Sequence, residues 1–141
     1  MTDSAGKTGE SILVVDDAPD VLANLGAFLA KAGFTVEKAT SGDEALCKIL
    51  ADPRINTLVT DLAMPGLSGT ALIARAKQVR PNLKALVITG SPNAELPPQI
   101  PFLVKPFRRA TLIAKVESLL GKDTDPKRNE GIDRPMPGGQ G

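Results

Sequence analysis

Side chains that could handle a phosphoryl group stand at the ends of short apolar runs in this sequence. They are Asp16 and Asp17, then Asp61, then Thr89, and finally Lys105 followed by Pro106. If the apolar runs are parallel strands, their carboxyl ends meet at one edge of a sheet, where ligands bind in such folds. That edge would bring together carboxylates, a hydroxyl and an ammonium group.

Carboxylates that converge in this way need a compensating positive charge, because they cannot all ionise side by side without one. Mg²⁺ is suitable, since it binds a few carboxylate and carbonyl oxygens and keeps several waters. We expect Asp17 and Asp61 to ligate Mg²⁺ directly and the backbone carbonyl of Ala63 to add a third protein oxygen. Asp16 is expected to act largely through water.

Asp61 is the expected nucleophile of the set, because a carboxylate can attack phosphorus and form an acyl phosphate. The transferring group carries charge on its oxygens, and Lys105 and Thr89 would stabilise that charge. Each residue alone also has an ordinary explanation. An acidic pair can cap a helix, and a threonine can simply pack in a strand. The ordered combination favours phosphoryl chemistry.

Two patterns of apolar residues alternate along the chain: short continuous runs, and residues at helical spacing. These patterns predict the strands and helices that carry the residues named above. Continuous runs rich in Val and Ile predict buried strands, and a more polar run predicts an edge strand at 34–39. The buried runs are 12–15, 57–60, 85–89 and 102–104.

Apolar residues at helical spacing predict three helices between these strands and one more after the last strand. The helices are expected over 19–32, 43–50, 68–79 and 108–120. Pro19 near the first turn, Gly33 after the last turn and Ser41 as an N-cap are typical boundary signals. The spacing places Leu50 and Val79 on the inward faces.

Strands that alternate with helices predict an α/β fold with a five-stranded parallel sheet and helices on both faces. For this length we expect the flavodoxin-like strand order 2-1-3-4-5. The prolines at 92, 97, 98 and 101 leave room for at most one helical turn between the last two strands. The helix between these two strands, which would be the fourth along the chain, is therefore expected to be short or absent.

Composition narrows the possible functions. The 141 residues carry a formal net charge of +1 with no basic run, so neither nucleic acid nor an anionic membrane is expected as a partner. The absence of His excludes histidine-based zinc sites and a phosphohistidine carrier. The single cysteine, Cys47, is expected to be a buried thiol. The chain shows no secretory pattern and no apolar stretch long enough to cross a bilayer, so a cytoplasmic location is expected.

The expected organisation is a flexible N-terminus at 1–10, one domain at 11–121 and a disordered tail at 122–141. The tail is rich in Lys, Asp, Pro and Gly and has almost no apolar residues, so it could not bury a core.

The ordered set Asp16-Asp17, Asp61 with Met64-Pro65, Thr89 and Lys105-Pro106 resembles the receiver domain of two-component response regulators. The resemblance covers residues 12–120 and implies that Asp61 accepts its phosphoryl group from a phosphohistidine on a sensor kinase or phosphotransfer protein. It also implies a cis bond before Pro106 and a switch in which Thr89 moves towards the phosphoryl group while Phe102 turns inward.

The Thr89-Gly90 pair and the reduced fourth helix are similar to stand-alone receivers with a Thr-Gly motif. The resemblance thus implies a receiver that signals through protein contacts or acts as a phosphate shuttle or sink, as a monomer or a phosphorylation-dependent dimer. Such a chain catalyses only its own phosphorylation and dephosphorylation. In this sequence Phe102 stands where the family more commonly has Tyr.

Two other functions remain open at this point. A pseudo-receiver would keep the fold as an adaptor and never take phosphate, although all the expected site residues are present. A phosphatase of the haloacid dehalogenase type also uses an Asp nucleophile with Mg²⁺. That family needs a second acid two residues after its nucleophile, where this chain has Ala63.

Overall fold

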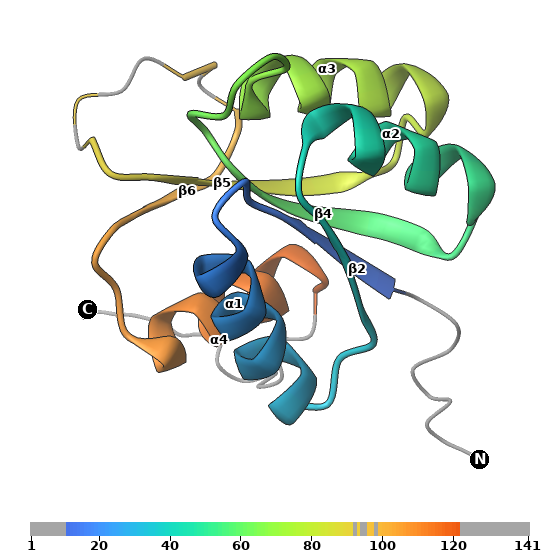
Figure 1. The fold of residues 1–141 in the computed structure, drawn as a ribbon. Helices are drawn as coiled ribbons and strands as arrows, with labels where there is room; N and C mark the ends of the chain where they lie inside the picture. Colours follow the sequence, from blue (N-terminus) through green and yellow to red (C-terminus); the bar gives the residue numbers. More distant parts are fainter. Residues whose placement is uncertain (1–10, 92, 94–95, 98, 122–141) are drawn as a thin grey trace.

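The computed structural model describes residues 11–91, 93, 96–97 and 99–121 (Figure 1). The expected flexible N-terminus and disordered tail lie outside these residues. In chain order the elements are β2 (Ser11–Val15), α1 (Pro19–Lys31), β3 (Val36–Ala39), α2 (Gly42–Ala51), β4 (Ile55–Asp61), α3 (Gly69–Val79), β5 (Lys84–Thr89), β6 (Phe102–Val104) and α4 (Arg109–Leu119).

The strands form one parallel sheet in the order β3-β2-β4-β5-β6. In chain order this is second, first, third, fourth, fifth, which confirms the predicted topology. The order reverses between β2 and β4, so their carboxyl ends flank the crevice where a parallel sheet binds ligands. Asp16 directly follows β2, and Asp61 is the last residue of β4.

Helices cover both faces of the sheet, with α2 and α3 on one side and α1 and α4 on the other (Figure 1). Successive side chains of β2 point to opposite faces of the sheet, because a β-strand is pleated. Leu13 and Val15 belong to the core under α2 and α3, whereas Ile12 and Val14 belong to the core against α1 and α4. Both cores are almost entirely aliphatic, and together they hold the sheet edge in place.

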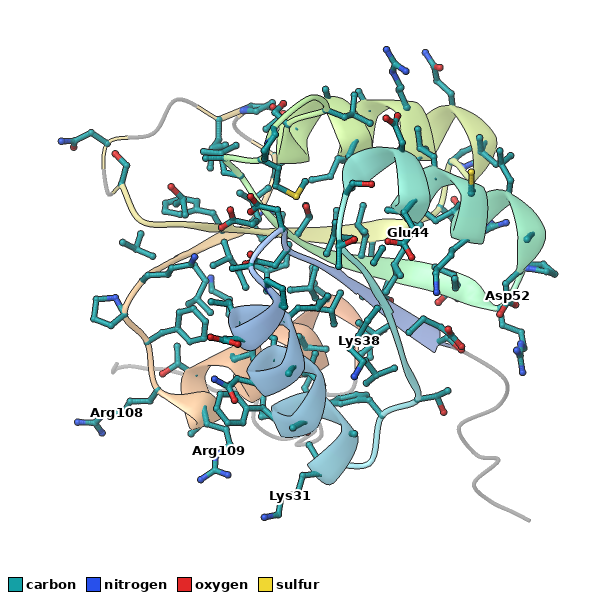
Figure 2. The ribbon with its side chains drawn as sticks, viewed as in Figure 1. Lys31, Lys38, Glu44, Asp52, Arg108 and Arg109 are labelled. Atoms are coloured by element: carbon teal, nitrogen blue, oxygen red, sulfur yellow. The ribbon has the colours of Figure 1, made fainter. Side chains whose placement is uncertain are left out.

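The helix boundaries follow the signals in the sequence. Pro19 is the first residue of α1, and Gly33 follows its end with φ 103°, a conformation that favours glycine. The Ser41 Oγ accepts the Glu44 N–H at 3.1 Å, so Ser41 is the N-cap of α2. In return, the Glu44 carboxylate accepts the Thr40 N–H at 2.8 Å and the Thr40 hydroxyl at 3.0 Å. Figure 2 shows Glu44 at this end of the helix.

The reciprocal bonds at Glu44 predict a pH-dependent contribution to stability. The Thr40 N–H, followed by the Thr40 hydroxyl, lowers the pKa of Glu44. Because the folded pKa lies below the unfolded one, the stabilisation is present above the unfolded pKa and disappears as pH falls through the folded pKa. We expect Glu44→Gln to cost about 0.5 kcal/mol at neutral pH in urea titrations, and progressively less as the pH falls through the folded pKa of Glu44.

Asp43→Asn is the matched control, because it removes a charge from the same helical turn. Equal losses in the two variants would assign the effect to the helix dipole rather than to the Thr40 bonds.

Three side chains expected in the interior are at the surface. Cys47 is exposed, contrary to the prediction of a buried thiol. Leu50 on α2 is 63% exposed and Val79 on α3 is 43% exposed, so the inward placement of both was wrong. The two residues stand near the C-terminal ends of their helices.

The connection between β5 and β6 contains no helix among its described residues, which show only turns and a bend. Leu96 and Ile100 nevertheless pack against the core on the α2 and α3 face. For the described residues, this agrees with the predicted short or absent helix in this connection. Within the described residues, no helix has the length and apolar character to cross a membrane.

Candidate functional site

Backbone hydrogen bonds tie together the loops at the carboxyl edge of the sheet. The Leu62 N–H donates to the Ile88 carbonyl at 2.8 Å, and the Lys105 N–H donates to the Thr89 carbonyl at 2.8 Å. These bonds extend the strand pairing beyond β4 and beyond β6 by one residue each. As a result, the chain immediately around Asp61, Thr89 and Lys105 is held as firmly as the sheet itself.

Asp16, Asp17 and Asp61 form one acidic cluster at this edge. Each offers a carboxylate oxygen, and these oxygens all lie within 4.8 Å of one another. Asp16 is 2% exposed and Asp61 is 8% exposed, whereas Asp17 faces solvent. The cluster thus joins two buried carboxylates with one at the mouth of the site.

Only one of the two Asp16 carboxylate oxygens accepts a hydrogen bond from a described protein group. One of its oxygens accepts the Ala18 N–H at 2.9 Å, and the other is buried without a hydrogen-bond partner in the described structure. Burial raises the pKa of Asp16 against the effect of that hydrogen bond, and the nearby charge of Asp61 raises it further. A buried oxygen of this kind, among hard oxygen donors, suits a divalent cation with bound water. The residues therefore fit Mg²⁺.

Lys105 provides the positive charge nearest to Asp61. Its Nζ lies 3.2 Å from Asp61 Oδ1, with the Asp61 side chain largely buried and the Lys105 side chain partly exposed. The Lys105–Pro106 peptide bond is cis. An ammonium at this distance from the acceptor carboxylate is placed to hold the oxygens of a group bound there.

Thr89 is the last residue of β5 and is buried beside this site. Its Oγ1 accepts the Ser91 N–H at 3.0 Å and lies 3.5 Å from the Ser91 carbonyl oxygen. Among the described residues, no hydrogen bond joins this hydroxyl to Asp61 or Lys105. The hydroxyl is thus near the site and engaged with the following loop.

The two remaining predicted residues lie at the surface of the molecule. Ala63 is exposed in the loop after β4, two residues beyond Asp61. Phe102 opens the edge strand β6 and is 43% exposed, so its ring faces outward. Their predicted roles, as a carbonyl ligand and as the aromatic member of the switch, stay predictions.

Gly69 is a residue of the site to which the sequence analysis assigned no role. A Cβ atom at this position would overlap the Asp61 carbonyl oxygen and lie 3.0 Å from Leu62 Cα. The Gly69 N–H also donates to the Leu62 carbonyl at 2.9 Å. The start of α3 therefore packs directly against the backbone of Asp61. A glycine at the first position of a helix, where most residues are tolerated, is a weak sequence hint of such close packing.

The close approach predicts a large effect for Gly69→Ala. Neither backbone can swing aside as a flexible side chain could, so the chain after β4 must shift. We expect a loss of about 1–3 kcal/mol in the free energy of unfolding. We also expect phosphoryl transfer to Asp61 to slow by about tenfold or more, because small displacements of reacting groups are costly.

Urea titration and intact-mass kinetics would measure the two effects. Gly90→Ala is the matched control, because a Cβ there would meet nothing within 4 Å. Equal stability of the two variants would contradict the packing argument.

Comparisons with known proteins agree with this geometry. The sequence matches the response regulator receiver domain over residues 12–117. It is 32% identical to the response regulator receiver protein CpdR of Brucella abortus (strain 2308), over 77% of this chain and 95% of that protein. It is 33% identical to the transcriptional regulatory protein PrrA of Mycobacterium tuberculosis (strain H37Rv), over 82% of this chain but only 52% of that protein.

Among solved structures, the chain is similar to the response regulator TrrA of Thermotoga maritima, crystallised in a complex described as Mg(2+)-BeF. The identity is 28% and the TM-score 0.71, with 78% of this chain and 98% of that chain covered. The sequence match, the shared topology and the position of the acidic cluster lead to one conclusion: this chain belongs to the response regulator receiver domain family.

Proposed function

We propose that this chain accepts a phosphoryl group onto Asp61 from a phosphohistidine donor and signals through protein contacts. The observation that carries the proposal is the joint position of Asp61, 3.2 Å from the Lys105 ammonium and within 4.8 Å of carboxylate oxygens of Asp16 and Asp17. A nucleophilic carboxylate, a fixed cation and a cation-binding pair are the parts that phosphoryl transfer needs.

In this proposal Asp17 and Asp61 would bind Mg²⁺, the Ala63 carbonyl would add an oxygen ligand, and Asp16 would act largely through water. When bound, Mg²⁺ would neutralise the acidic cluster and the charge on the phosphoryl oxygens. The complex of TrrA, a relative with the same fold, supports this part of the proposal.

The chain's own residues would then perform separate tasks. Asp61 Oδ attacks phosphorus, the bond between phosphorus and the donor nitrogen breaks, and the phosphoryl group stays on Asp61 as an acyl phosphate. The Lys105 ammonium and the Thr89 hydroxyl hold its oxygens. Since the reacting groups all belong to one acceptor site, the chain would catalyse only its own phosphorylation and dephosphorylation.

We further propose that the donor is a sensor histidine kinase or a histidine phosphotransfer protein. The receiver domain of the hybrid histidine kinase CckA, 29% identical to this chain with a TM-score of 0.69, covers 78% of this chain and 98% of its own length. It supports a place in such a relay. CpdR, a response regulator receiver protein that this chain matches over 95% of its length, supports action as a separate receiver module. The output of such a module would be a protein contact or phosphate relay.

Intact-mass measurement tests the proposal. With Mg²⁺ and phosphoramidate, we expect the wild-type protein to gain the mass of one phosphoryl group and Asp61→Asn to gain none. No gain in the wild type would favour a pseudo-receiver. A gain that persists in Asp61→Asn would place the phosphoryl group elsewhere. Repeated turnover of a generic phosphate ester would favour a phosphatase.

A further inference from the structure

A groove of about 360 Å³ lies at the amino-terminal end of β5, between the end of α3, the start of β6 and the end of α4. Its lining includes two lysines, Lys77 from α3 and Lys84 from the start of β5, and the apolar side chain of Leu119 from α4. None of the described residues that line it is acidic. The groove therefore combines positive charge with an apolar wall, at the opposite end of β5 from the phosphoryl site.

A second, smaller cavity of about 50 Å³ shares Lys84 with the groove and is also lined by Asn56, Thr57 and Leu120. The Thr57 Oγ1 and the Asn56 Oδ1 are both buried, and neither has a hydrogen-bond partner in the described structure. Thr57 as a whole is only 1% exposed. Because a buried polar oxygen without a partner costs free energy, the two oxygens indicate that hydrogen-bond donors belong at this cavity.

The chain continues from this place into its C-terminal segment. Leu119 is the last residue of α4 and lines the groove, and Leu120 is the C-cap and lines the cavity. Gly121 follows with φ 70°, the left-handed conformation that ends a helix. The next residues, which lie outside the described ones, have the sequence Lys-Asp-Thr-Asp-Pro. Covalent geometry alone keeps the backbone of Asp123 within about 11 Å of Leu120.

We propose that residues 122–126 dock back along this groove, with the carboxylates of Asp123 and Asp125 against the ammonium groups of Lys77 and Lys84. Backbone N–H groups of the same segment supply the donors that the two buried oxygens lack. The docked segment covers the groove beside a connection that contains no helix among its described residues. The inference goes beyond the proposed function and does not depend on phosphoryl transfer. It narrows the expected disorder of the tail to the residues after 126.

The chain's own segment fits the groove better than a separate acidic peptide does. Exposed ion pairs are individually weak, so two of them would hold a free peptide poorly. A segment attached to Leu120 by a few residues has an effective concentration in the millimolar range or above, which makes the same weak contacts sufficient.

Coupling with a water-soluble carbodiimide tests the contact in the full chain. This reagent joins a carboxylate to a neighbouring amine through an amide bond and takes up the released water to become a urea. At low protein concentration, peptide mass mapping should find Asp123 or Asp125 linked to Lys77 or Lys84 within one chain. The yield should be about tenfold or more above that of links to Lys31, an exposed lysine of α1 outside the groove.

High salt should reduce these links, because it screens exposed charges. Links spread evenly over the exposed lysines would overturn the proposal. Links formed only between two chains would overturn it as well, because a second copy would then be the occupant.

Matched variants provide a second readout. Asp123→Asn combined with Asp125→Asn removes both carboxylates, and Glu130→Gln combined with Asp133→Asn removes the same charge further along the same segment. In NMR spectra, the amide signal of Lys84 should shift in the first variant and keep its wild-type position in the second. Amide exchange in the docked segment should be about threefold faster in the first variant. Equal spectra and equal exchange in the two variants would overturn the docking.

Discussion

Replacing Lys105 with methionine should slow phosphoryl transfer to Asp61 by about 100-fold or more, the usual effect of removing one preorganised charge from a reacting centre. The Lys105 ammonium lies 3.2 Å from Asp61 Oδ1, and the Asp61 side chain is 11% exposed, so the charge acts more strongly on it than on a carboxylate fully in water. Methionine keeps most of the length of the side chain and removes the charge. The rate of mass gain with Mg²⁺ and phosphoramidate measures the effect.

Two further variants test whether the position of the charge matters, and not only its presence. Lys84→Met removes a lysine from the opposite, amino-terminal end of β5, where the side chain is exposed. It should leave the rate unchanged. Lys105→Arg keeps the charge but carries it on a longer, planar group, so we expect only partial activity. Equal rates for Lys105→Met and Lys84→Met would show that the Lys105 ammonium has no part in transfer.

Replacing Asp17 with asparagine should weaken Mg²⁺ binding by about tenfold or more and slow Mg²⁺-dependent phosphorylation with it. Asp17 is the exposed member of the acidic cluster, and its loss leaves two buried carboxylates that cannot bind the ion as strongly. A ligand that binds only the folded state raises its stability, so the midpoint of thermal unfolding reports the binding. Added Mg²⁺ should raise that midpoint in the wild type far more than in Asp17→Asn.

Asp20→Asn is the matched control for this experiment. Asp20 is also an exposed acidic residue near the start of α1, but it is not part of the cluster. The variant should respond to Mg²⁺ like the wild type. If Asp17→Asn and Asp20→Asn responded equally, the Mg²⁺ effect would be general screening of negative charge rather than binding at the cluster.

The sheet and the site could be predicted because both depend on short-range patterns. Alternation of apolar runs with helical spacing specifies a parallel sheet, and a parallel sheet places its strand ends together. The side chains that directly follow each apolar run are therefore expected to lie together at one edge of the sheet. Asp16, Asp61 and Lys105 meet at that edge for this reason, although they lie far apart in the sequence.

The exposure of individual helix residues could not be predicted in the same way. Helical spacing shows which side of α2 is apolar, but the width of the covered stripe depends on how α3 and the sheet pack against it. Leu50 is consequently exposed while Ile49 is fully buried. Close approaches between backbones leave no signal in the spacing of apolar residues, as the contact of Gly69 with the Asp61 backbone shows.

Arg80 makes contacts of longer range that the sequence does not signal either. Its guanidinium donates to the carbonyls of Ile49, Asp52 and Ile55, residues 25 to 31 positions away. Figure 2 shows Asp52 at the end of α2, where the last carbonyls of a helix, such as that of Ile49, have no partner within the helix. In the sequence Arg80 is only a polar residue that follows a predicted helix.

The acyl phosphate itself can be located by reduction with borohydride, which converts an aspartyl phosphate into homoserine at the same position. After incubation with Mg²⁺ and phosphoramidate, peptide mass mapping of the reduced protein should find homoserine at position 61, and none when Mg²⁺ is removed by a chelator. Homoserine at another aspartate, or an unmodified Asp61 in protein that has gained a phosphoryl group, would contradict the account.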